Sequence, residues 1–185
     1  MAQSTRFPVP SGAVATVKII DTTSKIAKLP VEFLMTPPMP GFQYMPELPS
    51  WSFLVENPTG RKALFDLGIP KDWENMAPAV VKFVKEQGWD VEAQKNTSEI
   101  LQENGYTLES IGSIIWRCVL VSMENMFSGK TGKSNLDSHW HWDHLGDPST
   151  FPSSTELVVG PGFKANLMPG FPAKDGAPVR ESDFA

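Results

Sequence analysis

The chain has 185 residues, 41% hydrophobic and 20% charged, a composition typical of one globular domain rather than a disordered segment. Its net charge of −5 argues against nucleic acid or an anionic membrane as a partner, because either would favour a basic face. The single cysteine, Cys118, excludes an intrachain disulfide. No apolar run is long enough to span a bilayer, and the first residues lack the apolar core of a secretory signal. We therefore expect a cytoplasmic location.

The first part of the chain predicts a flexible terminus followed by short strands. Residues 1–12 have no periodic pattern, whereas VATVKII (14–20) and VEFLMT (31–36) are rich in the residues that favour strands. Five prolines within residues 36–50 predict a loop. Two apolar runs joined by PTG then predict a β-hairpin over residues 51–68.

The rest of the chain alternates helical and strand-like segments. The apolar spacing between residues 72 and 87 predicts a helix, whose first turn is either broken at Pro78 or begins there. The other expected elements are a capped helix over 97–105, strands at 113–116 and 156–160, and a short helix that opens at Pro161. This alternation predicts an α/β or α+β class.

All three histidines of the chain fall inside SHWHWDHLGD (138–147), with the spacing H-x-H-x-D-H. Imidazole nitrogens and carboxylate oxygens are ligands that zinc and similar divalent ions prefer. If the segment is extended, alternate side chains share a face, so His139, His141 and Asp143 point one way and the intervening tryptophans the other. The alternative is a surface loop, or histidines that merely pack beside tryptophan.

Four potential ligands within six residues exceed what one tetrahedral ion can easily take from so short a stretch. We therefore predict two neighbouring metal sites, with His139 and His141 on the first and Asp143 and His144 on the second. Two close ions can bridge and activate a water molecule and stabilise an oxyanion, which is hydrolytic chemistry.

The same stretch resembles the signature of the metallo-β-lactamase-fold superfamily of hydrolases. The similarity extends to LFDLG (64–68), to LGDPSTFP after the histidines and to VVGPGF (158–163). These segments resemble a fungal branch related to homoserine-lactone lactonases, lactam-opening hydrolases and polyketide-releasing thioesterases. The resemblance implies two zinc ions and a metal-bridged hydroxide that attacks the carbonyl carbon of a small lactone, lactam, ester or thioester. It also implies that Asp143 is a catalytic residue that orients the water.

The resemblance assigns roles outside the histidine cluster as well. It implies that Asp66, at the end of the FDLG strand, lies below the metal site and supports its loop by hydrogen bonds. The alternative for Asp66 is an ordinary turn residue at a strand end. The proline-rich loop, through Phe42, Tyr44 and Met45, could line a substrate pocket or be a structural surface loop.

One departure from the family is the absence of any histidine after His144. The family fold is an αβ/βα sandwich whose second half supplies further metal ligands. We therefore expect residues 13–185 to form the first half only, a mixed sheet with flanking helices, an exposed edge and the second half missing. We therefore expect the hydrolase activity of this chain to be impaired, with one zinc ion or none in place of the two of an intact relative. The alternative function is a non-catalytic remnant or binding protein with an incomplete metal site.

A second departure is the segment 117–137, which separates the predicted strand from the histidines it should deliver. If Arg117 is encoded AGG and Ser138 AGC or AGT, splice signals frame these 21 codons, and their removal joins Trp116 to Ser138. We hypothesise a retained intron translated as a disordered insertion; the alternative is a genuine loop. Its SGKTGKS resembles a phosphate-binding loop, but Phe127 occupies the position of the first glycine.

Overall fold

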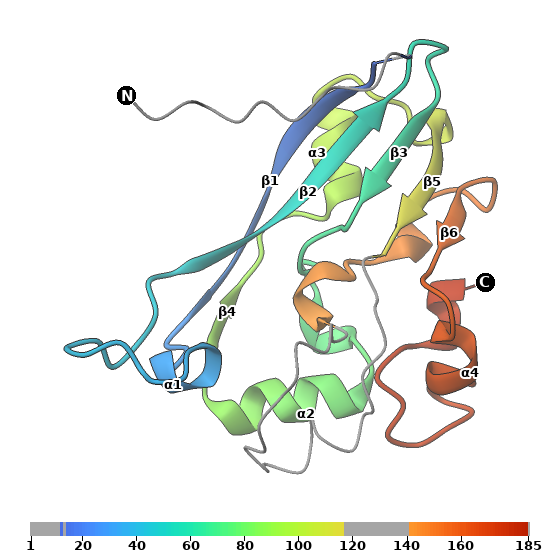
Figure 1. Cartoon of the computed structure of the whole chain (residues 1–185). Helices are drawn as coiled ribbons and strands as arrows, with labels where there is room; N and C mark the ends of the chain where they lie inside the picture. The colour runs from blue at the N-terminus through green and yellow to red at the C-terminus, as the bar shows by residue number, and fades with distance from the viewer. Residues whose placement is uncertain (1–11, 13, 117–140, 185) are drawn as a thin grey trace, which may run out of the picture.

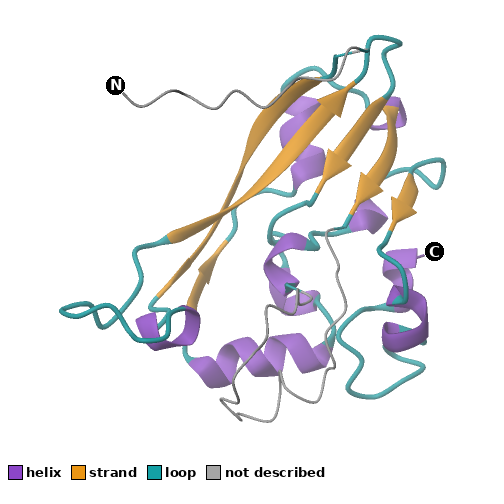
Figure 2. Ribbon diagram, viewed as in Figure 1, coloured by secondary structure: helices purple, strands orange, loops and turns teal. Residues whose placement is uncertain are grey.

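Six strands form one mixed sheet in the computed structural model, which describes residue 12, residues 14–116 and residues 141–184 (Figure 1). The strands are β1 (Thr16–Ala27), β2 (Leu48–Glu56), β3 (Lys62–Phe65), β4 (Asp90–Glu92), β5 (Ile111–Ile115) and β6 (Glu156–Val158). They lie in the order β4-β1-β2-β3-β5-β6, with helices around the sheet (Figure 2). The expected α/β class and the mixed sheet with flanking helices are confirmed.

The direction of the strands determines where the functional segments meet. Strands β4, β1, β2 and β3 pair antiparallel, whereas β3, β5 and β6 pair parallel. The predicted hairpin is confirmed as β2 and β3, and Asn57 closes its turn by accepting hydrogen bonds from the N–H groups of Thr59 and Arg61 at 3.0 Å each. Because β3 and β5 are parallel, the residues that follow Phe65 and Ile115 emerge at the same edge of the sheet.

The helices are α1 (Val31–Leu34), α2 (Pro78–Gln87), α3 (Thr97–Glu103) and α4 (Phe163–Leu167). A separate 3₁₀ turn, Trp73–Asn75, precedes α2, which begins at Pro78 because proline has no N–H to lose in a first helical turn. Helix α3 begins with a capping box between Asn96 and Glu99. Among the described helices, none has the length and apolarity needed to cross a membrane.

The predicted strand at residues 31–36 is wrong, because Val31–Leu34 form one helical turn. Only Val31 of its four side chains is buried, so the segment lacks the alternate burial that stabilises a strand. Pro30 precedes the turn, and Phe33 packs edge-on against Trp89 with ring centroids 4.8 Å apart. The sequence analysis also missed β4, which has only three residues.

The two faces of the sheet are covered differently. The inner face buries Leu54, Leu64 and Ile114 almost completely, in one cluster with residues of α2 and α3. The outer face carries an apolar row of five side chains that are paired strand to strand: Ile19, Phe53, Phe65, Ile115 and Val158. Its ends are open, since Ile19 is 66% exposed and Val158 38%. The outer face is therefore apolar but only partly covered by the described residues.

Candidate metal-binding site

The three predicted ligands that the structure describes, His141, Asp143 and His144, lie in a tight turn rather than in an extended strand. Trp142–His144 form a 3₁₀ turn closed by a hydrogen bond of 3.3 Å from the His144 N–H to the His141 carbonyl. The extended backbone assumed for this segment is therefore wrong from Trp142 to His144, although Trp142 is buried while His141 and Asp143 are partly exposed. His139 lies outside the described residues, as does the predicted insertion 117–137.

Asp143 lies between the two histidines that the structure describes. Its Oδ1 is 3.6 Å from His141 Nδ1, and its Oδ2 is 3.4 Å from His144 Nε2. The side chains of His141, Asp143 and His144 are 39%, 20% and 23% exposed, so solvent reaches all three. The predicted division of ligands between two ions stays a prediction, and here Asp143 neighbours both imidazoles.

The surroundings of Asp143 keep its carboxyl group ionised, which is the protonation state that a metal ligand requires. Burial alone would raise the pKa of its carboxyl group, but the contact with His141 and the charges of both histidines outweigh burial and lower it. The side chain is consequently an ionised carboxylate at neutral pH. Metal binding needs no proton to leave this group.

Asp66 lies on the other side of the His144 ring. Its Oδ2 is 3.4 Å from His144 Nδ1, and its side chain is buried. The Nδ1 atom is also buried and makes no hydrogen bond within the described ranges, so the pair is at ion-pair distance without hydrogen-bond geometry. The family resemblance implied that Asp66 lies below the metal site and supports its loop by hydrogen bonds, and that role stays a prediction.

Two turns interlock beneath the candidate ligands. We call residues 65–69, which comprise FDLG and Ile69, the FDLG turn, and residues 144–147 the motif loop. The Leu67 N–H donates to the His144 carbonyl at 2.9 Å, and the Gly146 N–H donates to the Gly68 carbonyl at 2.8 Å. Gly146 has φ +57°, and a Cβ there would overlap the Leu67 side chain. The two turns therefore fit only because this position is glycine.

Two further side chains hold the motif loop, and the sequence analysis missed both. Trp116, at the end of β5, donates its buried indole N–H to the Leu145 carbonyl at 2.9 Å. Arg180 donates hydrogen bonds to the carboxylates of Asp147, at 3.1 Å, and Asp183, at 2.7 Å. Burial of the Asp183 carboxyl group raises its pKa, and the hydrogen bonds from Arg180 only partly oppose this effect. The apolar strand that ends at Trp116 is the only sequence feature that indicates a buried, anchoring role for this residue. Arg180 lies in a segment without hydrophobic periodicity or a recognisable motif.

The donor set has the chemistry of a zinc site, but its described part is incomplete. Imidazole nitrogens and a carboxylate suit zinc, and a second carboxylate behind His144 is the usual support for a metal-binding histidine. Within residues 14–116 and 141–184, no three His, Cys, Asp or Glu side chains are grouped so that they could hold an ion. The residues present thus fit zinc in kind, and a complete site needs ligands beyond them.

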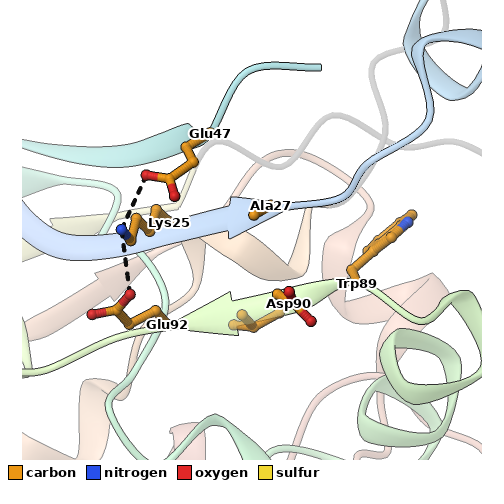
Figure 3. A pocket seen from close by; sticks show the side chains of 7 residues that line it. Lys25, Ala27, Glu47, Trp89, Asp90 and Glu92 are labelled. Atoms are coloured by element: carbon orange, nitrogen blue, oxygen red, sulfur yellow. Dashed lines mark hydrogen bonds and ion pairs between the residues drawn. The ribbon is translucent and has the colours of Figure 1, made fainter. Parts of the chain in front are cut away.

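A surface hollow lies away from these residues, along the β1–β4 edge of the sheet (Figure 3). It has a volume of about 480 Å³ and is lined by Lys25, Ala27, Glu47, Trp89, Asp90, Val91 and Glu92. None of the predicted site residues lines it. Phe42 and Tyr44 of the proline-rich loop are exposed, and Met45 packs on the core. That this loop lines a substrate pocket stays a prediction.

Comparison with known proteins identifies relatives along most of the chain. It is 39% identical to gamma-lactamase FDB1 of Fusarium pseudograminearum, over 97% of this chain and 40% of that protein. It is 40% identical to gamma-lactamase MBL2 of Gibberella moniliformis, over 64% of this chain and 41% of that protein. It is 33% identical to metallo-hydrolase mfmC of Annulohypoxylon moriforme, over 90% of this chain and 39% of that protein. No protein-family model matches the sequence.

Among solved structures, a quorum-quenching N-acyl homoserine lactone hydrolase aligns with a TM-score of 0.42 and 15% identity, over 78% of this chain and 57% of that one. The sequence relatives are named as lactamases and a metallo-hydrolase, and they match this chain along most of its length. The chain belongs to the metallo-β-lactamase-fold family and is related to the fungal gamma-lactamases. It spans about 40% of the length of these curated relatives.

Proposed function

We propose that this chain carries the metal-binding part of a hydrolase that opens a small lactam or lactone, or cleaves a small ester or thioester. The observation that supports this proposal most directly is the position of the Asp143 carboxylate between His141 and His144, with Asp66 behind His144. Relatives named gamma-lactamases support a lactam as the first substrate to try. A cytoplasmic location stays a prediction.

Each candidate residue has a defined task in this proposal. His139, His141, Asp143 and His144 hold zinc, with two ions in a complete relative. Bound zinc supplies a Lewis acid for the carbonyl oxygen and lowers the pKa of water. Asp143, ionised at neutral pH, accepts a hydrogen bond from the attacking water and orients it. Asp66 fixes the ring of His144 through its Nδ1 side.

One observation favours a second function, a non-catalytic binding protein with an incomplete metal site. In the described ranges no three side chains form a group that could hold an ion. Such a protein would bind one metal ion or none and would not turn over substrate.

The decisive experiment measures zinc and turnover on the full 185-residue chain. After loading and dialysis, the hydrolase proposal expects two equivalents of zinc and hydrolysis of a chromogenic lactam. His141→Ala and Asp143→Asn should abolish turnover, whereas Glu92→Gln, a carboxylate change on the distant β4 edge, should leave it intact. Zinc without turnover favours the binding protein. Turnover that survives His141→Ala contradicts the proposed site.

A further inference from the structure

Three buried hydroxyl groups hold the FDLG turn from beneath. Their oxygens belong to two strands of the sheet and to the start of α3, and each contacts a different backbone group of the turn. Ser52 Oγ donates to the Asp66 carbonyl at 2.8 Å, Thr97 Oγ1 donates to the Leu67 carbonyl at 2.7 Å, and Ser24 Oγ accepts from the Ile69 N–H at 3.3 Å. The turn is thereby fixed by side chains that no solvent reaches.

Ser52 is the most unexpected of the three. It lies on the inner face of β2, two residues before the fully buried Leu54, where the pattern calls for an apolar side chain. A buried hydroxyl costs free energy unless it is hydrogen-bonded. The bond from Ser52 to the Asp66 carbonyl satisfies this requirement, and it links the centre of the sheet to the residue behind His144.

Asp66 needs such a restraint because its backbone is left-handed, with φ +59°. A residue with a Cβ adopts this conformation only when its surroundings impose it. Two bonds impose it here: the Asp66 N–H donates to the Ile115 carbonyl at 3.0 Å, and the Asp66 carbonyl accepts from Ser52. In this conformation the carboxylate Oδ2 lies 3.4 Å from His144 Nδ1.

We propose that Ser52 is a positioning residue for the metal ligand His144 and that it acts through Asp66. The inference rests on the proposed function in treating His144 as a ligand. A neutral imidazole carries one proton, and two carboxylates compete for it, because Asp66 Oδ2 lies 3.4 Å from Nδ1 and Asp143 Oδ2 lies 3.4 Å from Nε2. Asp66 is the group that favours the proton on Nδ1. The lone pair of Nε2 then faces Asp143 and the solvent side, where an ion binds. Loss of the Ser52 hydroxyl frees Asp66 to leave its left-handed conformation and so removes this preference.

The first test is made on the metal-free chain, so it does not depend on catalysis. Nitrogen-15 NMR of the three histidine rings, at a pH where they are neutral, shows which ring nitrogen of His144 carries the proton. We expect the fraction of His144 rings protonated on Nδ1 to fall, and the fraction protonated on Nε2 to rise, in Ser52→Ala relative to the unchanged chain. The matched control is Ser50→Ala, which removes an equally buried hydroxyl two residues away with no bond to the FDLG turn among the described residues. An unchanged His144 signal in Ser52→Ala overturns the proposal.

The second test measures zinc affinity by competition with a chromophoric chelator. Support lost behind a metal-binding histidine typically weakens metal affinity about 10–100-fold. We expect this loss for Ser52→Ala and an affinity close to that of the unchanged chain for Ser50→Ala. Equal losses in both variants would show a general packing effect and overturn the proposal.

The two tests separate this inference from the proposed function. If the unchanged chain binds no zinc, the metal-binding role fails, while the NMR result still decides whether Ser52 controls His144 through Asp66. If circular dichroism shows that Ser52→Ala is unfolded, Ser52→Cys replaces it, because a thiol fills the same space and is a weak donor. Ser52→Cys should then shift the His144 proton, and no shift overturns the proposal.

Discussion

The FDLG turn and the motif loop meet beneath the candidate ligands but are held by different kinds of interaction. The FDLG turn is anchored by neutral hydroxyls from the sheet and α3. The motif loop is anchored by backbone bonds to that turn, by the Trp116 indole and by the charged Arg180. Both are held by residues far away in sequence, but the turn is held by buried neutral groups, whereas the loop depends in part on a partly exposed charged side chain. The following substitutions test this difference.

The largest effect is expected where the two segments interlock. Gly146→Ala places a Cβ against the Leu67 side chain at a left-handed φ of +57°, so overpacking adds to backbone strain. We expect the free energy of unfolding to fall by about 3 kcal/mol in urea denaturation. Gly60→Ala is the control, because its φ is +82° and nothing lies within 4 Å of an added Cβ. Equal losses in the two variants would mean that the interlock contributes nothing.

The second effect concerns the charged anchor of the motif loop. Arg180→Met leaves Asp183 buried without the guanidinium that donates to it, and it releases Asp147. Removing one member of a buried ion pair is costly, but the Arg180 side chain is 20% exposed, so we expect a loss of about 2 kcal/mol. The unfolding free energy from urea denaturation provides the measurement.

Lys25→Met is the matched control for Arg180→Met. Lys25 also bridges two acids, Glu47 at 3.0 Å and Glu92 at 3.3 Å, but all three are exposed (Figure 3). Its removal should cost much less, because exposed ion pairs are screened by solvent and contribute little to stability. If Lys25→Met were the more destabilising of the two, the motif loop would not depend on its buried charge.

The third effect isolates one hydrogen bond to the motif loop. Trp116→Phe removes the indole N–H that donates to the Leu145 carbonyl, and Trp89→Phe removes a buried indole N–H that has no partner among the described residues. Both changes delete the same atoms from a buried ring. The loss of unfolding free energy should be about 1–2 kcal/mol greater for Trp116→Phe. A difference near zero would remove Trp116 from the set of anchors.

Local patterns explain what could be predicted about this fold. The β2–β3 hairpin follows from two apolar runs around a PTG turn, and the first turn of α3 from polar residues that cap it. The H-x-H-x-D-H segment indicated metal chemistry because its ligand types lie close together in sequence. In each case the residues that decide the structure are near neighbours along the chain.

The remaining features depend on contacts that sequence periodicity does not contain. Val31–Leu34 form a helical turn although their composition favours a strand, because only one of the side chains is buried. Trp142 enters the core and so ends the extended geometry expected for the histidines. The bond between Arg180 and Asp147 spans 33 residues, and the left-handed conformation of Asp66 is imposed by Ser52 and Ile115. None of these contacts has a local pattern.

The smallest expected effect is a pH dependence at the start of α3, which supplies Thr97 to the FDLG turn. Hydrogen bonds from Lys71 and from the Asn96 backbone lower the pKa of Glu99 below its ordinary value of 4.5. The stabilisation is therefore complete above the unfolded pKa and is lost as the pH falls through the folded pKa. The Glu99 side chain is 40% exposed, so the contribution is only about 0.5 kcal/mol.

Glu99→Gln should consequently flatten the acid limb of the curve of unfolding free energy against pH. The motif loop should respond with the opposite sign, because burial raises the pKa of Asp183 and its ionisation costs stability as the pH rises. Asp183→Asn should therefore remove a decline in unfolding free energy that occurs as the pH rises from the unfolded pKa of this group to its folded pKa, and it should leave the Glu99 decline in place. If both substitutions flattened the same limb, the two anchors would not differ in the way that their contacts indicate.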